Sequence, residues 1–175
     1  WYATGPGVGI QLRKGPHKGR LVIPCDHKVS SEKGTSGYHS HVIYSDDHGK
    51  NWKLGGIAGH FTNECQVVEL GDRTLLLNMR NYQGQGGGDK TKGKRRAVTR
   101  SRDGGTTWSD VEYDDVLIEP ICQASLHSHV DARGKRVLLF SNPATQTRRR
   151  QLTVRLSRDE GKTWSEPKSL PKDAR

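Results

Sequence analysis

The sequence predicts an all-β fold built from repeated antiparallel sheets. One octet of the form S-x-D-x-G-x-x-W occurs at 45–52, 101–108 and 157–164, so successive copies begin 56 residues apart. A fixed period of this size indicates stacked units rather than one irregular core. Val, Ile, Leu and Thr occur in short runs that suit strands, and no segment shows the 3.6-residue periodicity of an amphipathic helix.

Each octet predicts a tight turn between two strands. Its Ser and Asp side chains can hydrogen-bond to turn amides, its Gly accepts a positive φ, and its Trp can cover the apolar side of the hairpin. Each copy follows an apolar or alternating run, at 41–44, 97–100 and 152–156. We therefore predict that the Ser and Asp of the octets are structural rather than catalytic.

The first unit contains four predicted strands. A Gly-rich stretch at 5–12 leads into the first strand, and a basic turn at 13–19 precedes the second strand at 20–25. A loop rich in Ser, Lys and Gly then reaches the third strand at 39–44, and the fourth strand starts at Trp52 after the octet. These strands predict one four-stranded antiparallel sheet.

The second and third units repeat this order. Their other predicted strands lie at 64–70, 74–78, a segment ending at Ser101, 122–127, 135–141, 152–157 and 164–170. Four strands per repeat of about 50 residues is typical of a β-propeller blade. Three blades do not close a ring, so we expect three blades of an incomplete propeller, at about 5–60, 61–118 and 119–175.

The positive net charge of the chain limits the classes of partner that we expect it to bind. The formal net charge is +10, with much of the excess in the stretches 90–102 and 148–158. This balance favours anionic partners, either nucleic acid or an acidic sugar, although a solvated basic face is an equally simple explanation. Only 6% of residues are aromatic and three of the four Trp belong to the octets, so few side chains could stack on bases. We predict no nucleic-acid partner, and the apolar runs are too short to span a membrane.

The cysteines and histidines do not form a recognised metal motif. Two pairs, His39-x-His41 and His127-x-His129, each place two imidazoles on one strand face, but no acidic or Cys ligand pattern accompanies them. We therefore predict no metal site and no cofactor. The three cysteines are widely spaced, which predicts buried free thiols at Cys25, Cys65 and Cys122.

Five further segments complete the pattern, and we expect all but the first to lie where propeller strands project side chains toward the central funnel. They are 5–12 (GPGVGIQL), 63–70 (NECQVVEL), 77–82 (LNMRNY), 122–126 (CQASL) and 149–155 (RRQLTVR). With the octets, which resemble Asp-boxes, they resemble in order and over nearly the whole chain the exo-α-sialidases (neuraminidases) of the bacterial and animal type. The resemblance implies a six-bladed propeller, of which this chain would be an internal fragment. It also implies a secreted, periplasmic or lysosomal-type compartment.

The resemblance implies a catalytic role for one residue and carboxylate binding for two others. Glu64 matches the family's glutamate that partners a tyrosine nucleophile, and Arg80 matches the second arginine of a carboxylate-binding triad. Arg149 matches the third arginine, although Arg148 and Arg150 flank it and the match admits a shift of one residue.

Three more residues match the substrate pocket of the family. Gln123 falls on a position that lines the pocket. Asp26 and Lys28 fall near the part that holds the glycerol or N-acyl side of the sugar.

These residue types suit the implied chemistry. Sialic acid carries a carboxylate on its anomeric carbon, and a guanidinium group binds a carboxylate through two hydrogen bonds of fixed geometry. The same carboxylate would repel an anionic nucleophile, which a neutral tyrosine hydroxyl avoids. A phenol with a pKa near 10 needs a base such as Glu64 to attack at neutral pH.

Three functional positions of the family have no match here. They are an aspartate acid/base and a first triad arginine, both upstream, and the nucleophilic tyrosine downstream; Tyr82 and Tyr113 stand outside its motif. We therefore expect this chain alone not to turn over substrate.

The predicted function is hydrolysis of terminal sialic acids from glycoproteins, glycolipids or oligosaccharides. Two alternatives remain open. The chain could belong to a non-catalytic propeller that binds glycans or proteins, and Glu64 could pair with Arg80 only for stability.

Overall fold

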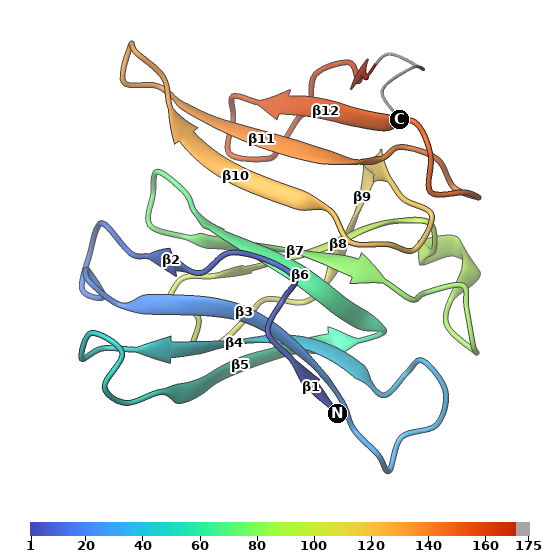
Figure 1. The fold of residues 1–175 in the computed structure, drawn as a ribbon, viewed down its shortest axis with the longest axis horizontal. Coiled ribbons are helices and arrows are strands. Elements are labelled where there is room, and N and C mark those ends of the chain that lie inside the picture. Colours follow the sequence, from blue (N-terminus) through green and yellow to red (C-terminus); the bar gives the residue numbers. More distant parts are fainter. Residues whose placement is uncertain (171–175) are drawn as a thin grey trace.

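The structure, a computed structural model, describes residues 1–170 and contains three antiparallel sheets side by side (Figure 1). The strands are β1 (Tyr2–Ala3), β2 (Ile10–Gln11), β3 (Leu21–Lys28), β4 (Tyr38–Ser45), β5 (Lys53–His60), β6 (Thr62–Glu69), β7 (Leu75–Asn81), β8 (Arg95–Ser101), β9 (Glu112–Ile118), β10 (Ser125–Val130), β11 (Arg136–Pro143), β12 (Leu152–Ser157) and β13 (Lys168–Ser169). The end of the third predicted unit, 171–175, lies outside the described residues.

The strand order within each sheet follows the chain. The second sheet has the order β6-β7-β8-β9, the third β10-β11-β12-β13 and the first β1-β3-β4-β5, with β2 also paired to β3. The only helix in residues 1–170 is a short 3₁₀ turn at Lys90–Lys92, and no helix there could span a membrane. The predicted all-β class with four-stranded antiparallel blades is confirmed, and the three sheets do not close into a ring.

The Gly-rich stretch at 5–12 leads into the short strand β2, and another short strand, β1, precedes this stretch. Only β2 pairs with the start of β3, whereas β1 pairs with its far end, and the residues between them leave the sheet. Pro6 has no N–H for a ladder hydrogen bond, and Gly5 has a φ of 105° that a strand does not use. Gly7 lets this loop approach β6, since a Cβ there would lie 2.8 Å from the carbonyl oxygen of Cys65.

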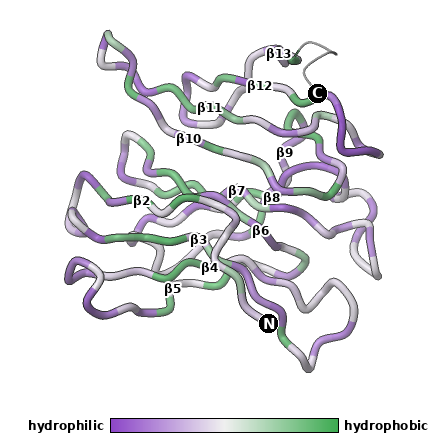
Figure 2. The backbone as a smooth tube through the Cα atoms, in the orientation of Figure 1, coloured by the Kyte–Doolittle hydropathy of each residue, from purple (hydrophilic) through white to green (hydrophobic). Residues whose placement is uncertain are grey.

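The second sheet is buried on both faces. Val67, Leu75 and Leu77 pack against the first sheet in one apolar cluster. Val68 and Leu76 point the other way, into a second cluster with the third sheet. This two-sided burial explains why β6 and β7 read as nearly continuous apolar runs, which Figure 2 shows as hydrophobic segments in the middle of the molecule.

The three octets form the predicted turns. In the second copy, Gly105 N donates to Ser101 Oγ at 2.8 Å, and Ser101 Oγ donates to Asp103 Oδ1 at 2.8 Å. Asp103 Oδ1 also accepts from Thr107 N at 2.9 Å, and equivalent bonds recur in the other two copies. Gly105 has a φ of 92°, so the turn requires glycine there.

The Trp of an octet also joins neighbouring sheets. Trp108 Nε1 donates to Gly56 O on β5 at 2.9 Å, and Trp164 Nε1 donates to Asp114 Oδ2 on β9 at 2.9 Å. Each of these indoles therefore reaches back to the last strand of the preceding sheet. Trp52 instead donates to Gly49 O of its own turn and is 42% exposed.

The cysteines agree with the sequence. All three are buried and carry free thiols, as predicted.

Candidate active site

A pocket of about 610 Å³ opens at the end of the sheets opposite the octet turns. It lies between β1, the end of β3, the start of β4 and β6, and the end of β7. Its lining residues are Trp1, Tyr2, Ala3, Thr4, Gly5, Pro6, Asp26, Tyr38, Asn63, Glu64, Arg80 and Tyr82. Three of the predicted site residues, Asp26, Glu64 and Arg80, are among them.

Glu64 and Arg80 meet across two neighbouring strands. The pairing of Cys65 with Met79 places Glu64 on β6 opposite Arg80 on β7. Arg80 donates from its Nη1 to Glu64 Oε2 at 2.8 Å, and both side chains are half-buried. Glu64 Oε1 has no hydrogen bond within the described residues, so it can still accept one.

Arg80 keeps hydrogen-bonding capacity that the described residues do not use. Its Nε is buried and has no hydrogen-bond partner in residues 1–170. The guanidinium carbon lies 4.8 Å from the centre of the Tyr82 ring, which holds the plane of the guanidinium. A buried, unpaired N–H of a cation is costly unless an acceptor binds it, so the site suits an anionic ligand.

Asp26 lies beneath this pair and is fully buried. Asn63 donates from its Nδ2 to Asp26 Oδ2 at 2.5 Å, while Oδ1 has no partner in the described part of the chain. Burial raises the pKa of Asp26 to about 7; the negative charge of Glu64 also raises it, and the Arg80 guanidinium lowers it. Asp26 can therefore carry a proton near neutral pH.

Gln123 and Lys28 border the pocket without lining it. Gln123 Nε2 donates to the Pro6 carbonyl oxygen at 2.5 Å, which ties the third sheet to the loop between β1 and β2. The Lys28 ammonium lies 5.2 Å from the centre of the Tyr38 ring, on the lining wall.

Arg149 is exposed in the connection between β11 and β12 and is not a lining residue. Its Nη2 donates to Ile121 O at 3.5 Å, two residues before Gln123. Burial raises the pKa of the Cys122 thiol, while the charges of Arg149 and Arg80 act to lower it. Arg149 therefore lies beside the segment that leads into β10, outside the pocket that contains Glu64 and Arg80.

The structure also shows a lining that the sequence did not reveal. Tyr38 and Tyr82 have ring centres 5.1 Å apart, and Trp1 meets Tyr38 edge-on at 5.7 Å. These rings form an aromatic wall of the pocket. Tyr82 followed Arg80 in a recognised motif, but Trp1 and Tyr38 stood in no motif and come together only through strand pairing.

A buried ion pair bonds to the backbone beside two of the candidate residues. Arg96 on β8 pairs with Glu119, and both side chains are fully buried. Glu119 Oε1 accepts from the backbone N–H of Asn81, next to Arg80. Arg96 Nη1 donates to the Cys122 carbonyl oxygen at 2.6 Å, next to Gln123. The pair therefore fixes two strand ends that carry candidate residues.

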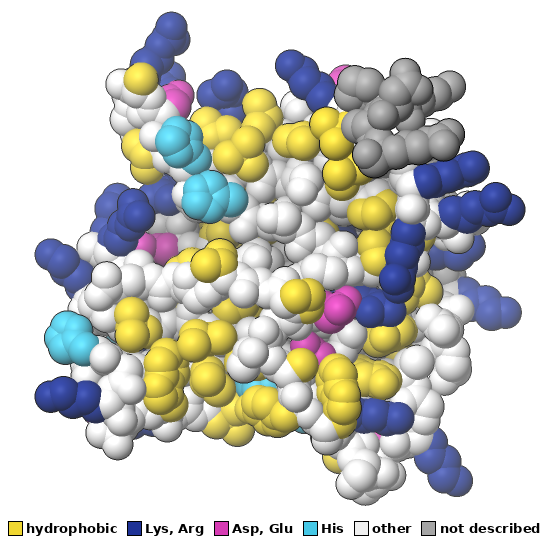
Figure 3. All heavy atoms as spheres, viewed as in Figure 1, with side chains coloured by type: hydrophobic (Ala, Val, Ile, Leu, Met, Phe, Trp, Pro, Cys, Tyr) yellow, Lys and Arg dark blue, Asp and Glu magenta, His cyan; other side chains and the backbone are white. Residues whose placement is uncertain are grey.

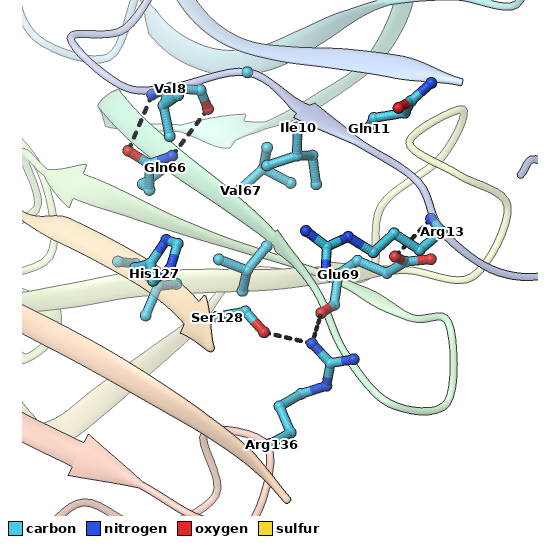
Figure 4. A pocket seen from close by; sticks show the side chains of 13 residues that line it. Val8, Ile10, Gln11, Arg13, Gln66, Val67, Glu69, His127, Ser128 and Arg136 are labelled. Carbon is cyan, nitrogen blue, oxygen red and sulfur yellow. Dashed lines mark hydrogen bonds between the residues drawn. The ribbon is translucent and has the colours of Figure 1, made fainter. Parts of the chain in front are cut away.

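A second hollow lies among β2, β6 and β10 and contains none of the candidate residues (Figure 4). Most of its polar groups are already paired, although the buried Nε of Arg136 has no hydrogen-bond partner in residues 1–170. Glu69 accepts from the backbone N–H groups of Arg13 and Lys14, and Gln66 exchanges hydrogen bonds with the backbone of Val8. These contacts join the sheets and leave the pocket at Glu64 and Arg80 as the candidate active site.

Comparison with known proteins gives a consistent family. Residues 1–174 match the model described as a BNR repeat-like domain. A sialidase of Micromonospora viridifaciens is 39% identical over 163 residues, which is 90% of this chain and 23% of that protein. A sialidase of Bacteroides fragilis is 38% identical over 172 residues, or 94% of this chain and 28% of that protein. The chain thus spans about a quarter of the length of these curated relatives.

Solved structures agree with the sequence relatives. The Hadza microbial sialidase Hz136 superposes with a TM-score of 0.79 at 36% identity, covering 97% of this chain and 30% of that one. A leech intramolecular trans-sialidase superposes with a TM-score of 0.71 at 26% identity, covering 94% and 24%.

Proposed function

The chain belongs to the sialidases of the BNR repeat-like domain family, and from this premise we propose that the complete protein is a retaining exo-α-sialidase. Its substrates would be terminal sialic acids on glycoproteins, glycolipids or oligosaccharides. The observation that carries the proposal is the contact between Glu64 and Arg80 in a pocket where Arg80 Nε has no partner among the described residues.

The proposed roles follow from charge and geometry. Arg80 binds the sialic acid carboxylate, and Arg149 approaches it from the third sheet when substrate is bound. The free Glu64 Oε1 accepts the proton of a tyrosine hydroxyl, supplied elsewhere in the protein, as the phenol oxygen attacks the anomeric carbon. The glycosidic bond breaks and its oxygen leaves with a proton from an acid; water then releases the sugar from the tyrosine.

The remaining candidates complete the pocket. The aromatic wall contacts the sugar, and Gln123 holds the Pro6 loop against the third sheet. Asp26 and Lys28 lie on the side assigned to the glycerol or N-acyl group. Below a pH of about 7, Asp26 is mainly protonated and adds little negative charge next to an anionic substrate.

The first test replaces Arg80 by Ala in the full-length protein and measures hydrolysis of a fluorogenic sialoside. Loss of a charge-assisted hydrogen bond should lower kcat/KM about 10- to 100-fold or more. Arg102→Ala is the matched control, because this exposed arginine belongs to an octet turn at the opposite end of the sheets. Unchanged kinetics of Arg80→Ala would contradict the assignment.

Glu64→Gln separates catalysis from binding. The amide keeps an oxygen to accept from Arg80 but removes the base, so kcat should fall about 100-fold or more while binding of a sialic acid analogue persists. A wild-type protein that binds sialosides without cleaving them would instead support the non-catalytic glycan-binding alternative. Analysis of the products would distinguish hydrolysis, which releases free sialic acid, from intramolecular transfer.

A further inference from the structure

Three side chains from separate segments converge on the first sheet, on the face turned away from the second sheet. We propose that Glu32, His39 and His60 bind one divalent transition-metal ion, for which Zn²⁺ is the best chemical match. Glu32 lies in the loop before β4, His39 near the start of β4 and His60 at the end of β5. Their ligand atoms all lie within 4.8 Å of one another.

Strand pairing brings the two imidazoles together. His39 on β4 is the register partner of His60 on β5, and their ring centres are 4.7 Å apart. This pair is not the His39-x-His41 pair of the linear sequence. His39 lies beside His60 because of the pairing of β4 with β5, which includes register shifts, and the loop before β4 brings Glu32 to both imidazoles. The acidic ligand missing from the linear pattern is thus supplied by the fold.

The two separations between Glu32 and the imidazoles suit one small ion. Glu32 Oε1 lies 3.4 Å from His39 Nε2, and Glu32 Oε2 lies 3.1 Å from His60 Nδ1. Ligand atoms at about 2.1 Å from a tetrahedral Zn²⁺ are about 3.4 Å from each other. Two imidazoles and one carboxylate, with water in the fourth position, form a common Zn²⁺ ligand set.

His39 is the observation that points to a ligand rather than to a simple ion pair. It is 7% exposed, and its Nε2 has no hydrogen-bond partner in residues 1–170 although it lies close to Glu32. On the other side of the ring, Nδ1 is 3.5 Å from the Ala58 carbonyl oxygen. A proton held on Nδ1 by this carbonyl leaves the Nε2 lone pair free, and metal-bound histidines usually donate their other ring N–H to such an acceptor.

The proposed ion would fix one wall of the candidate active site. The loop between β3 and β4 carries Glu32 and leads directly to Tyr38, whose ring lines the pocket. Its Thr35 Oγ1 donates to Gln85 O, so the same loop also touches the connection after β7. Binding at Glu32 therefore ties this loop to β4 and β5, and the ion serves a structural role independent of the proposed reaction.

The test titrates Zn²⁺ into the metal-free full-length protein and into the variants Glu32→Gln and His60→Gln. The wild type should bind one Zn²⁺ per chain at this site, and each variant should bind at least about 10-fold more weakly. Both variants change side chains that are partly or largely exposed, so folding is preserved. His129→Gln is the control, since it removes an exposed imidazole from β10 and should bind Zn²⁺ like the wild type.

A spectroscopic and a thermal readout complete the design. Co²⁺ should give the intense visible bands of a four-coordinate ion in the wild type and in His129→Gln, and not in His60→Gln. Zn²⁺ at 100 times its Kd should raise the unfolding temperature of the wild type and of His129→Gln by about a few degrees, because the shift per unit of free energy falls with protein size. Equal Zn²⁺ affinity in the wild type and both ligand variants, or no binding at all, would overturn the proposal and leave an ordinary carboxylate–histidine contact.

Discussion

Asp26 shows how burial sets the properties of a single residue. The sequence placed it beside the pocket, but nothing in its neighbours along the chain predicted full burial. Its environment depends on two residues of β6. Asn63 donates a hydrogen bond to its carboxyl group, and Glu64 contributes a second negative charge. The raised pKa has a consequence for stability that can be measured.

The pH dependence of unfolding should carry the signature of Asp26. Its carboxyl group ionises near 3.9 in the unfolded chain and near 7 in the folded one, so the folded state holds the proton more tightly. The free energy of unfolding should therefore fall as pH rises from about 4 to 7, by as much as about 4 kcal/mol, and change little above that. Asp26→Asn should remove this slope in urea unfolding at a series of pH values.

The control for this measurement is the difference between the two proteins at each pH. Other titrating groups contribute equally to both, so they cancel. Parallel pH profiles of the wild type and Asp26→Asn would contradict the assigned pKa.

At the level of single residues, prediction depended on local motifs. The segments around Glu64 and Arg80 marked both residues, and the structure puts them in contact. The roles assigned to them and to Arg149 stay predictions. The cluster of Glu32, His39 and His60 could not be read from the sequence, because it depends on register shifts and on the path of a loop.

At the scale of the element, the octet is the unit that the sequence predicts best. Ser, Asp, Gly and Trp at fixed offsets specify a turn through short-range hydrogen bonds, so the prediction is confirmed at all three sites. The short strand β1, which precedes Gly5, was not predicted. The interruption at Gly5–Pro6 depends on where the loop meets β6, which is a tertiary contact.

Two octet tryptophans offer a matched comparison. Trp108→Phe removes the hydrogen bond to Gly56 O between two sheets and part of a half-buried ring, so it should lower the free energy of unfolding by about 1–3 kcal/mol. Trp52→Phe removes a bond only within its own turn at an exposed position and should cost about 0.5 kcal/mol or less. Urea unfolding checks both, and equal losses would contradict the inter-sheet role.

At the scale of the whole molecule, the structure shows where the positive charges lie and which of them are paired with acids. In the view of Figure 3, most Lys and Arg side chains lie at the periphery of the face. The basic stretch at 90–102 is partly neutralised, because three of its arginines pair with acids on or just after β9. These pairs are Arg95 with Asp115, Arg96 with Glu119, and Arg100 with Glu112.

The absence of a nucleic-acid partner stays a prediction, now with a structural reason. Paired arginines release few counterions from a phosphate backbone, so filter-binding titrations with single- and double-stranded DNA should show no specific, steeply salt-dependent affinity. A non-sequence-selective polyanion such as heparin serves as the control for weak charge attraction. Submicromolar DNA binding at physiological salt would contradict the prediction.

The hydrogen bonds from two octet tryptophans to the preceding sheet have a consequence for folding during synthesis. Trp108 and Trp164 each anchor to a strand made about 50 residues earlier, namely to Gly56 and Asp114. The ribosome synthesises the chain from its amino terminus, so each new sheet can pack against the preceding sheet, which has already left the ribosome. We expect vectorial assembly, in which nascent chains stalled after residue 118 has left the ribosome already resist protease across the first two sheets.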